Sequence, residues 1–338
     1  MSGGPERIAV TDLERLVAAA LEGAGTSRAN ALSVSRALVT AEIDGQKGHG
    51  LSRVASYAAQ VRAGKVIGDA TPTAERTRPS TLAIDAAHGF AYPALDIAND
   101  QLPAMAKECG IAAAGIRRSH HAGALGLVAE RLANAGLMAL VFANTPSAIA
   151  PWGGGRALLG TNPIAFAAPR LDARPIVIDL ALSEVARGKI VSAAQRGEPI
   201  PPGWAIDKDG HPTTDADAAL RGTLLPSGGA KGAALALMVE FMAAAVTGSQ
   251  FASEASSFLD DRGSPPGTGQ LIIAIDGAGL GAGAGMMQRV AMLAFDISSE
   301  PGARLPGARR FAARDEARRM GVAVEAKLLA ELRSLAGN

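Results

Sequence analysis

The chain has 338 residues, 48% of them hydrophobic, so it can bury a large core, and its length alone suggests about two structural units. Lysine plus arginine (33) nearly balances aspartate plus glutamate (32), so no strong field would attract nucleic acid or an anionic membrane, and neither partner is expected. The single cysteine, Cys109, cannot form an internal disulfide, which favours a reducing, cytoplasmic location and argues against a cysteine-based zinc site.

The first 65 residues are predicted to be helical. In "VTDLERLVAAALEGAG", Thr11 and Glu14 have the spacing of a capping box before an apolar stripe. Two more apolar-periodic segments follow, at 29–43 and 49–64, so His49 is expected at the start of the third helix. The charged N-terminus lacks the apolar core of a signal peptide, so export is not expected.

From residue 80 onward, short apolar runs alternate with helical patterns, which is typical of an α/β layer. The runs read "TLAID", "IAAAGI", "LMALVFAN", "PIAFAAP" and "PIVIDLAL". Because they are continuously apolar, the sheet is expected to be covered on both faces. A late strand at 269–276 follows a long helix at 231–247, so the sheet should recruit segments that are distant in sequence.

The tail after Pro306 is helical and charged and could return to pack on the N-terminal helices. The expected organisation is therefore an N-terminal helical part (1–75), an α/β part (76–305) and a C-terminal helical part (306–338) that completes a discontinuous helical domain. The most apolar stretch, "LALMVEFMAAAV", contains Glu240 and is shorter than the roughly 20 residues that a membrane span needs.

Two loops stand out. The segment 254–269 is rich in proline and glycine, and long loops of this kind are often lids or interface arms. The segment 277–285, "GAGLGAGAG", suggests a dinucleotide-binding loop, but its glycines fall at every second position instead of at relative positions 0, 2 and 5. We therefore expect it to be a flexible connector.

The first chemical candidate is the pair of His49 and Arg53 in "GHGLSR". At positions i and i+4 of a helix, both side chains would project from one face. Histidine can exchange a proton near neutral pH, and the arginine fork can hold a carboxylate, a combination that suits a small 2-oxo or 2-imino acid. The alternative is a capping histidine and a solvated arginine. No Walker loop, HExxH, GxSxG or paired CxxC motif occurs, and no metal site is expected.

Other candidates lie where strands end. "RRSHHAGALG" places His120 and His121 between a strand and a helix, and small residues there could leave helix-start amides open to a phosphate, although both histidines could be structural. Thr161 in "GTNPIAF" could be part of a simple turn, and Ser183 after Asp179 in "DLALSEVARGK" could cap a helix. Lys231 in "PSGGAKG" suits a nucleotide phosphate, but a lone lysine is usually just solvated.

Together these segments resemble the malate/L-lactate dehydrogenase family of NAD(P)-dependent oxidoreductases, which lacks the usual Rossmann domain. The matching segments cover most of the chain in the order typical of the family: "GHGLSR", "GFAYPALDIA", "SHHAGALG", "GTNPIAFAAP", "DLALSEVARGK", "PPGWAIDKDGHPTTD", "LLPSGGAKGAALALMVE" and "GQLIIAID". Within the family, "GFAYPALDIA", "GTNPIAF" and "TGQLIIAID" are most similar to bacterial reductases of Δ1-piperideine-2-carboxylate and Δ1-pyrroline-2-carboxylate.

This resemblance implies an α/β fold with a mixed, non-Rossmann sheet that binds NAD(P), and a homodimer. It implies NADPH- or NADH-dependent reduction of a small 2-imino or 2-oxo acid, with cyclic imino acids giving L-pipecolate or L-proline as products. A malate-, L-lactate- or ureidoglycolate-type 2-hydroxy acid dehydrogenase is an alternative. A nucleotide-binding sensor without catalysis is a second alternative.

The resemblance also assigns roles to residues. His49 becomes the proton donor, His120 a second catalytic group near the substrate, and Arg53 and Thr161 substrate contacts. The implied cofactor contacts are His121, Ala122, Gly123, Ala124, Leu125, Asn144, Asp179, Leu180, Ala181, Lys231 and Arg304, the last within the segment 301–307. Two positions depart from the family pattern: Gly48 stands where a serine is common, and Lys189 where the imine reductases have an aspartate. A serine–aspartate relay to His49 is thus ruled out, and His49 would work with water, with Lys189 or by another proton route.

Overall fold

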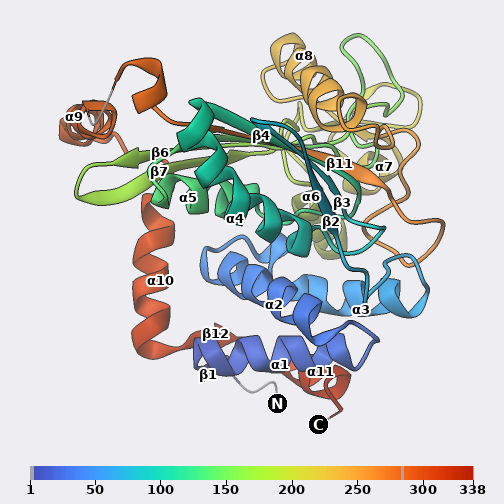
Figure 1. Cartoon of the computed structure of the whole chain (residues 1–338). Helices are drawn as coiled ribbons and strands as arrows, with labels where there is room; N and C mark the ends of the chain where they lie inside the picture. Colours follow the sequence, from blue (N-terminus) through green and yellow to red (C-terminus); the bar gives the residue numbers. More distant parts are fainter. Residues whose placement is uncertain (1–3, 283–284, 338) are drawn as a thin grey trace.

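Both chain ends form one helical layer beneath a large sheet in this computed structural model, which describes residues 4–282 and 285–337 (Figure 1). Strand β1 (Glu6–Ile8) pairs antiparallel with β12 (Val322–Val324), and helix α1 packs against α11. Their apolar side chains share one buried cluster with those of α2. The helices of this layer are α1 (Val10–Glu22), α2 (Arg28–Ile43), α3 (Val54–Arg62) and α11 (Ala326–Leu335).

The N-terminal helix is present, but its predicted capping box is wrong. Helix α1 begins at Val10, with Ala9 at the N-cap and no side-chain cap bond. It therefore begins before Thr11, which lies inside the first turn instead of at the cap position. Helix α2, in contrast, has a side-chain cap from Ser27, which accepts a hydrogen bond from the Asn30 amide.

A seven-stranded mixed sheet forms the centre of the fold, which confirms the predicted α/β class and its non-Rossmann sheet. The strand order is β2-β3-β4-β11-β5-β6-β7; only β3 and β4 pair in parallel. The late strand β11 lies between β4 and β5, as expected for a sheet that recruits distant segments. The strands are β2 (Thr73–Arg78), β3 (Thr81–Asp85), β4 (Ile111–Ser119), β5 (Met138–Ala143), β6 (Ile164–Arg170), β7 (Ala173–Leu180) and β11 (Thr268–Ile275).

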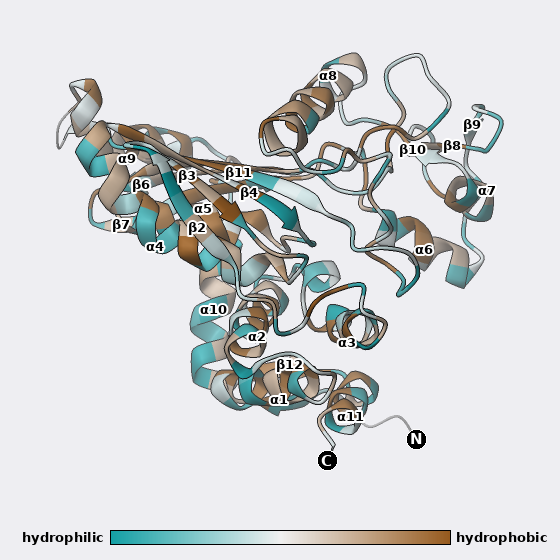
Figure 2. Ribbon diagram, turned by 45° about the vertical axis from the view of Figure 1, so that its right-hand side comes forward, coloured by the Kyte–Doolittle hydropathy of each residue, from teal (hydrophilic) through white to brown (hydrophobic). Residues whose placement is uncertain are grey.

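Helices contact both faces of this sheet. Helices α4 (Ala91–Cys109) and α5 (Leu125–Asn134) cover one face with the largest apolar cluster. On the opposite face lie α8 (Ala230–Val239), its continuation as the π-helix η3 (Glu240–Ala245), and α9 (Gly285–Ser299). In Figure 2 the central strands are largely brown, whereas α10 (Ala308–Met320) is mostly teal. The sheet core is thus apolar, and the charged α10 links it to the helical layer.

The segment between β7 and α8 forms a small lobe beside the sheet. It holds α6 (Arg187–Arg196), α7 (Ala216–Arg221) and a three-stranded sheet of β8 (Ala205–Ile206), β9 (Pro212–Thr213) and β10 (Thr223–Leu224). Because α6 begins at Arg187, the expectation that Ser183 caps this helix is wrong; Ser183 instead forms an isolated bridge with Pro226.

The two predicted loops have different outcomes. Residues 254–267 form no helix or strand before β11, as expected. In the glycine-rich loop, a short 3-10 turn η4 (Ala278–Leu280) follows β11, while residues 283 and 284 lie outside the described part of the chain. Within residues 4–282 and 285–337, no helix is both long and apolar enough to cross a membrane.

Candidate active site

Three imidazoles and two phenols form a connected cluster where the helical layer meets the sheet. The Nδ1 atom of His49 lies 3.1 Å from Nε2 of His121, and the two rings stack with centroids 5.1 Å apart. On its other side, Nδ1 of His121 lies 2.6 Å from the Tyr57 hydroxyl, which lies 3.1 Å from the Tyr92 hydroxyl. The side chains of His49, His121, Tyr57 and Tyr92 thus form one hydrogen-bonded chain.

Four elements bring this chain together. His49 ends the 3-10 turn η1 (Lys47–His49), His121 follows β4, Tyr57 lies on α3, and Tyr92 lies in the first turn of α4. Gly123 has a φ of +66°, and a Cβ there would lie 2.5 Å from the Tyr92 hydroxyl oxygen. Glycine is therefore required at this position in "SHHAGALG", because any side chain would displace the phenol.

The local structure around His49 corrects the sequence prediction. His49 ends one 3-10 turn, η1 (Lys47–His49), and Arg53 ends the next, η2 (Leu51–Arg53); helix α3 begins only at Val54. The two residues do not share a face of one α-helix. The break is at Gly50, where a Cβ would lie 2.4 Å from the Glu42 carboxylate, and the Leu51 amide donates to that carboxylate instead of to a helical carbonyl.

Burial keeps the imidazoles neutral. It lowers the pKa of His49 to about 4, with a smaller contribution from the positive charge of Arg53. It lowers the pKa of His120 to about 3 and that of His121 well below its usual value, again with Arg53 as the next cause. Burial raises the pKa of Tyr57 to about 12. All members of the hydrogen-bonded chain are therefore uncharged at neutral pH.

Arg53 is the cation whose charge acts on every ring of this cluster. Its charge affects the pKa values of His49, Tyr57, Tyr92, His120 and His121, so its guanidinium lies within electrostatic reach of all five rings. Its Nε donates to the Gly48 carbonyl at 2.6 Å. Among the described residues no acidic side chain pairs with this guanidinium, so its terminal nitrogens stay available to a ligand anion.

His120 lies beside the chain in an aromatic cage. Its ring makes edge contacts with the rings of Tyr57, Phe90 and Phe258, at centroid distances of 5.2 to 6.0 Å. It is 1% exposed, and neither ring nitrogen has a hydrogen-bond partner among the described residues. The residue that hydrogen-bonds to His49 is thus His121, for which the resemblance implied a cofactor contact, and not His120.

Phe258 belongs to the long loop 254–267, which two buried side chains fix against α3. The Gln60 side-chain amide donates to the carbonyls of Phe258 and Asp260, both at 3.0 Å. The ammonium group of Lys65, a residue 1% exposed, donates to the carbonyls of Asp260 and Arg262 and pairs with the Asp260 carboxylate at 3.3 Å. In this structure the loop is consequently a fixed wall of the cluster.

One amide at the start of α5 is already bound by a carboxylate of the protein. The Asp179 carboxylate, at the end of β7, accepts from the Gly126 amide at 3.0 Å and from the Gln46 side chain at 3.1 Å. The Gly126 amide is therefore not open to a phosphate, whereas phosphate binding by the preceding residues 121–125 stays a prediction. Asp179 also lies close enough to His49 to oppose the lowering of its pKa.

Thr161 and Asn144 belong to a neighbouring polar network. The Thr161 hydroxyl lies 3.2 Å from that of Thr145. Asn144 is 1% exposed, and its side chain donates to Glu240 and the Gln250 carbonyl and accepts from the Gly269 amide. The side-chain atoms of Asn144 are thus bonded inside the protein, and a contact of this residue with a cofactor stays a prediction.

Glu240, which interrupts the most apolar stretch of the sequence, is the centre of this network. Its carboxylate accepts from Asn144, from the buried Asn162 and from the Ala252 amide. Asn162 is therefore structural. Among the described residues, Thr161 is hydrogen-bonded through its hydroxyl and its amide to the Thr145 hydroxyl and not to His49, His120 or Arg53, so it lies in the neighbouring network.

The remaining cofactor candidates fall into two groups. Ala122, Ala124 and Leu125 are almost fully buried, whereas Leu180 is 48% exposed and Ala181 is also exposed. The Ser227 amide donates to the Leu182 carbonyl, which brings Leu180 and Ala181 beside the segment that leads to Lys231. Lys231 and Arg304 are exposed and have no ion-pair partner in the described ranges. The exposed candidates, which include the two cations Lys231 and Arg304, fit a nucleotide with negative phosphates better than the three buried residues do.

Neither departure from the family pattern supplies a relay to His49. Gly48 offers only its backbone carbonyl, which accepts from Arg53, and Lys189 is exposed on α6 with no side-chain bond among the described residues. The sequence did not show which groups would replace the serine–aspartate relay. In the structure, the groups hydrogen-bonded in series to His49 are His121, Tyr57 and Tyr92. One compositional signal pointed to them: the chain has only two tyrosines, and both lie here.

Comparison with known proteins gives a consistent result. The chain matches the profile of the malate/L-lactate dehydrogenase family over residues 8–333. It is 48% identical to a (2R)-3-sulfolactate dehydrogenase (NADP(+)) of Chromohalobacter salexigens, over 91% of this chain and 92% of that protein. It is 42% identical to a Δ1-pyrroline-2-carboxylate reductase of Ancylobacter novellus, over 98% of each. The crystal structure of a Δ1-piperideine-2-carboxylate reductase from Pseudomonas syringae matches with a TM-score of 0.93 and 37% identity, over 98% of this chain and 99% of that one.

Proposed function

Because the chain belongs to the malate/L-lactate dehydrogenase family and is thus an NAD(P)-dependent oxidoreductase, we propose that it reduces a cyclic 2-imino acid. The best candidates are Δ1-piperideine-2-carboxylate and Δ1-pyrroline-2-carboxylate, which would give L-pipecolate and L-proline. The relatives that carry these substrates in their names align with nearly the whole chain.

The observation that carries the proposal is the position of Arg53 beside a neutral, hydrogen-bonded His49. The guanidinium would bind the substrate carboxylate through two parallel hydrogen bonds. His49 is partly exposed, so a substrate held by Arg53 could reach the ring edge that does not face His121. An imine nitrogen must gain a proton as its carbon is reduced, and a neutral imidazole N–H can donate that proton.

The cofactor would supply the hydride for this reduction. We propose that Lys231 and Arg304 hold its phosphates and that Leu180 and Ala181 form the apolar surface beneath it. Asp179 keeps its bonds to Gly126 and Gln46 and so fixes the start of α5 beside that surface. The name of the 48%-identical relative specifies NADP(+), which favours NADPH over NADH here.

A second candidate is a 2-hydroxy acid dehydrogenase of the sulfolactate type, which the 48% identity to the Chromohalobacter enzyme favours. Such a substrate carries a sulfonate as well as a carboxylate and would require a second free cation. Lys65 is the other cation that lowers the pKa of His120, but its ammonium group is bonded to the loop 254–267. One available cation therefore fits a monocarboxylate better than a sulfonated acid.

We also propose that the protein is a homodimer, formed through the sheet face that carries α8 and α9. Large apolar side chains are exposed on both helices, including Phe241 on η3 and Phe295 on α9, the latter 72% exposed. Exposed apolar patches of this kind mark interaction surfaces. A second copy of the chain would cover them.

The test is a substrate panel assayed by NADPH and NADH oxidation. It includes the two cyclic imino acids, pyruvate, oxaloacetate and 3-sulfopyruvate. The proposal expects the highest kcat/KM for a cyclic imino acid with NADPH. A clear preference for 3-sulfopyruvate would establish the second candidate instead, and binding of NADPH without turnover on any substrate would contradict both.

A further inference from the structure

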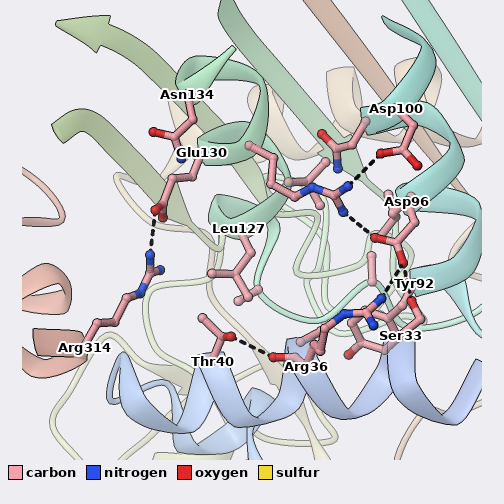
Figure 3. Close-up of a pocket in the computed structure, with 17 residues that line it drawn as sticks. Ser33, Arg36, Thr40, Tyr92, Asp96, Asp100, Leu127, Glu130, Asn134 and Arg314 are labelled. Carbon is pink, nitrogen blue, oxygen red and sulfur yellow. Dashed lines mark hydrogen bonds and ion pairs between the residues drawn. The ribbon is translucent and has the colours of Figure 1, made fainter. Parts of the chain in front are cut away.

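A cavity of about 450 Å³ lies behind the hydrogen-bonded chain, between α2, α4, α5 and α10. Figure 3 shows its polar walls: Ser33, Arg36 and Thr40 from α2, and Asp96 and Asp100 from α4. Ala122 and Ala124, which flank Gly123, line it as well. The cavity is thus on the far side of the "SHHAGALG" segment and shares a wall with the active-site cluster.

The charged groups of the cavity are already paired with one another. Arg131 binds Asp96 and Asp100, and Arg314 binds Glu130 at 2.6 Å and Asp44 at 2.5 Å. These pairs leave no net charge that would select a charged ligand. The cavity is therefore not built as an anion or cation site.

Asn99 is the exception among the cavity residues. It is only 7% exposed, and neither atom of its side-chain amide has a partner among the residues that the structure describes. A buried amide without partners is costly, and a polar cavity of this size has room for water molecules that satisfy it. Water is thus the occupant that the lining requires.

Tyr92 connects this water to the active site. Its side chain lines the cavity, and its hydroxyl, pressed against Gly123, is the last group of the chain that begins at His49. We propose that Tyr92 and Tyr57, through His121, carry the proton for reduction from cavity water to His49. This inference rests on the proposed function, and it assigns to two tyrosines a role in place of the missing serine–aspartate relay.

The geometry allows concerted proton transfer along the chain, from Tyr92 toward His49. Before reduction, the Tyr92 hydroxyl donates to Tyr57, Tyr57 donates to Nδ1 of His121, and Nε2–H of His121 donates to Nδ1 of His49, which leaves Nε2–H of His49 facing the substrate. As that proton passes to the imine nitrogen, each group gives one proton forward and receives one from behind. Tyr92 takes its replacement from cavity water, and the hydroxide that remains is neutralised by bulk solvent.

After the transfer, every hydrogen bond of the chain points the other way. His49 then carries its proton on Nδ1, and its Nε2 is a free base. This is the state that the reverse reaction, oxidation of the amine, needs in order to accept a proton. The same four groups therefore serve both directions, provided that neither histidine is doubly protonated, because an imidazolium would donate at both nitrogens and interrupt the chain.

The kinetic test compares Tyr92→Phe with Ser33→Ala. The first removes the terminal hydroxyl and keeps the ring; the second removes a hydroxyl of α2 that lines the same cavity and donates to Asp96. We expect Tyr92→Phe to lower kcat on the order of 10-fold, less than loss of the donor itself, with KM for substrate and NADPH unchanged. We also expect the solvent isotope effect to change from a multi-proton to a single-proton dependence on deuterium content. Wild-type kcat and isotope behaviour in Tyr92→Phe would overturn the inference.

A second measurement does not depend on turnover. In the substrate-free protein, ¹⁵N NMR of the histidines should show His49 and His121 neutral and in the same tautomer, since one proton lies in the bond between them. In Tyr57→Phe, His121 should no longer be held in a single tautomer, whereas in Ser33→Ala its tautomer should be unchanged. Opposite tautomers, or a charged ring at neutral pH, would overturn the relay even if the reductase activity is confirmed. A wild-type protein inactive on the whole panel would contradict the proposed function. The histidine tautomers measured by NMR would then still show whether the four groups are arranged as a proton relay.

Discussion

The ring of His49 stacks on that of His121, with Nδ1 of the first 3.1 Å from Nε2 of the second. This contact joins a 3-10 turn of the helical layer to the end of a central strand of the sheet. It fixes which edge of the His49 ring is left for a substrate, and it links that ring to two buried phenols.

Replacing His49 by alanine should lower kcat by about 10² to 10⁴, as the loss of a general acid usually does. Nucleotide binding should stay near normal, because no proposed cofactor contact depends on this side chain. The measurement is the initial rate of NADPH oxidation at saturating substrate. His211→Ala is the matched control, since its ring lies on the surface with 79% of the side chain exposed. Full activity of the His49 variant would show that His49 is not the proton donor.

Replacing Arg53 by lysine should raise KM for the substrate on the order of 10-fold, because the charge remains but the two-pronged carboxylate contact is lost. The bond from Nε to the Gly48 carbonyl is lost as well. Steady-state kinetics with varied substrate provide the value. Arg62→Lys, at an exposed position late in α3, should leave KM unchanged. An unaltered KM in the Arg53 variant would make this residue structural.

The protein should lose stability in acid through its buried imidazoles. His49 and His120 have pKa values of about 4 and about 3, below the usual value near 6.5, so the unfolded chain binds more protons as the pH falls. Their contribution is present above pH 6.5 and decreases below it, by about 1.4 kcal/mol per pH unit for each such group until its folded pKa is reached.

Urea unfolding at pH 7.5 and pH 5 would measure this effect. In His120→Leu, where an apolar side chain fills the aromatic cage, the difference in unfolding free energy between the two pH values should be smaller than in the wild type. An equal difference in both proteins would mean that His120 is already protonated, or exposed, in the folded state.

Replacing Lys65 by methionine should release the loop 254–267. The change leaves the Arg262 carbonyl without its donor and the Asp260 carbonyl with Gln60 alone, at a cost of about 1 to 3 kcal/mol in unfolding free energy. Limited proteolysis should then cut within the loop, and activity should fall because Phe258 no longer closes the His120 cage. Lys107→Met, on an exposed site of α4, is the control. A protease-resistant loop in the variant would show that Gln60 alone fixes it.

Placing a charge on the apolar face of α9 should shift the protein toward the monomer. Phe295→Asp puts an unpaired carboxylate where the proposed dimer buries an aromatic ring. Light scattering coupled to size-exclusion chromatography measures the mass. Met320→Asp, at a side chain 56% exposed near the end of α10, tests whether any new surface charge has this effect. Dimers of unchanged stability in Phe295→Asp would place the interface elsewhere.

Local patterns in the sequence determined the elements of this protein well. The apolar runs predicted β3 to β7 and β11, because a buried strand requires those side chains wherever it packs. Ordered motifs along the chain also indicated the family before any fold was known. The helix start near His49 was misjudged, because the break at Gly50 depends on Glu42 of another element.

The partners of each functional group were decided only by the tertiary structure. Asp179 and Gly126 are far apart in the chain, and so are Tyr57 and His121. The sequence around one residue of each pair does not indicate which residue it will bond to. The same holds for Asn144, whose side chain is occupied by Glu240 from the π-helix. Hydrogen bonds between distant segments form after the sheet and helices have packed, so their pairing follows from the fold as a whole.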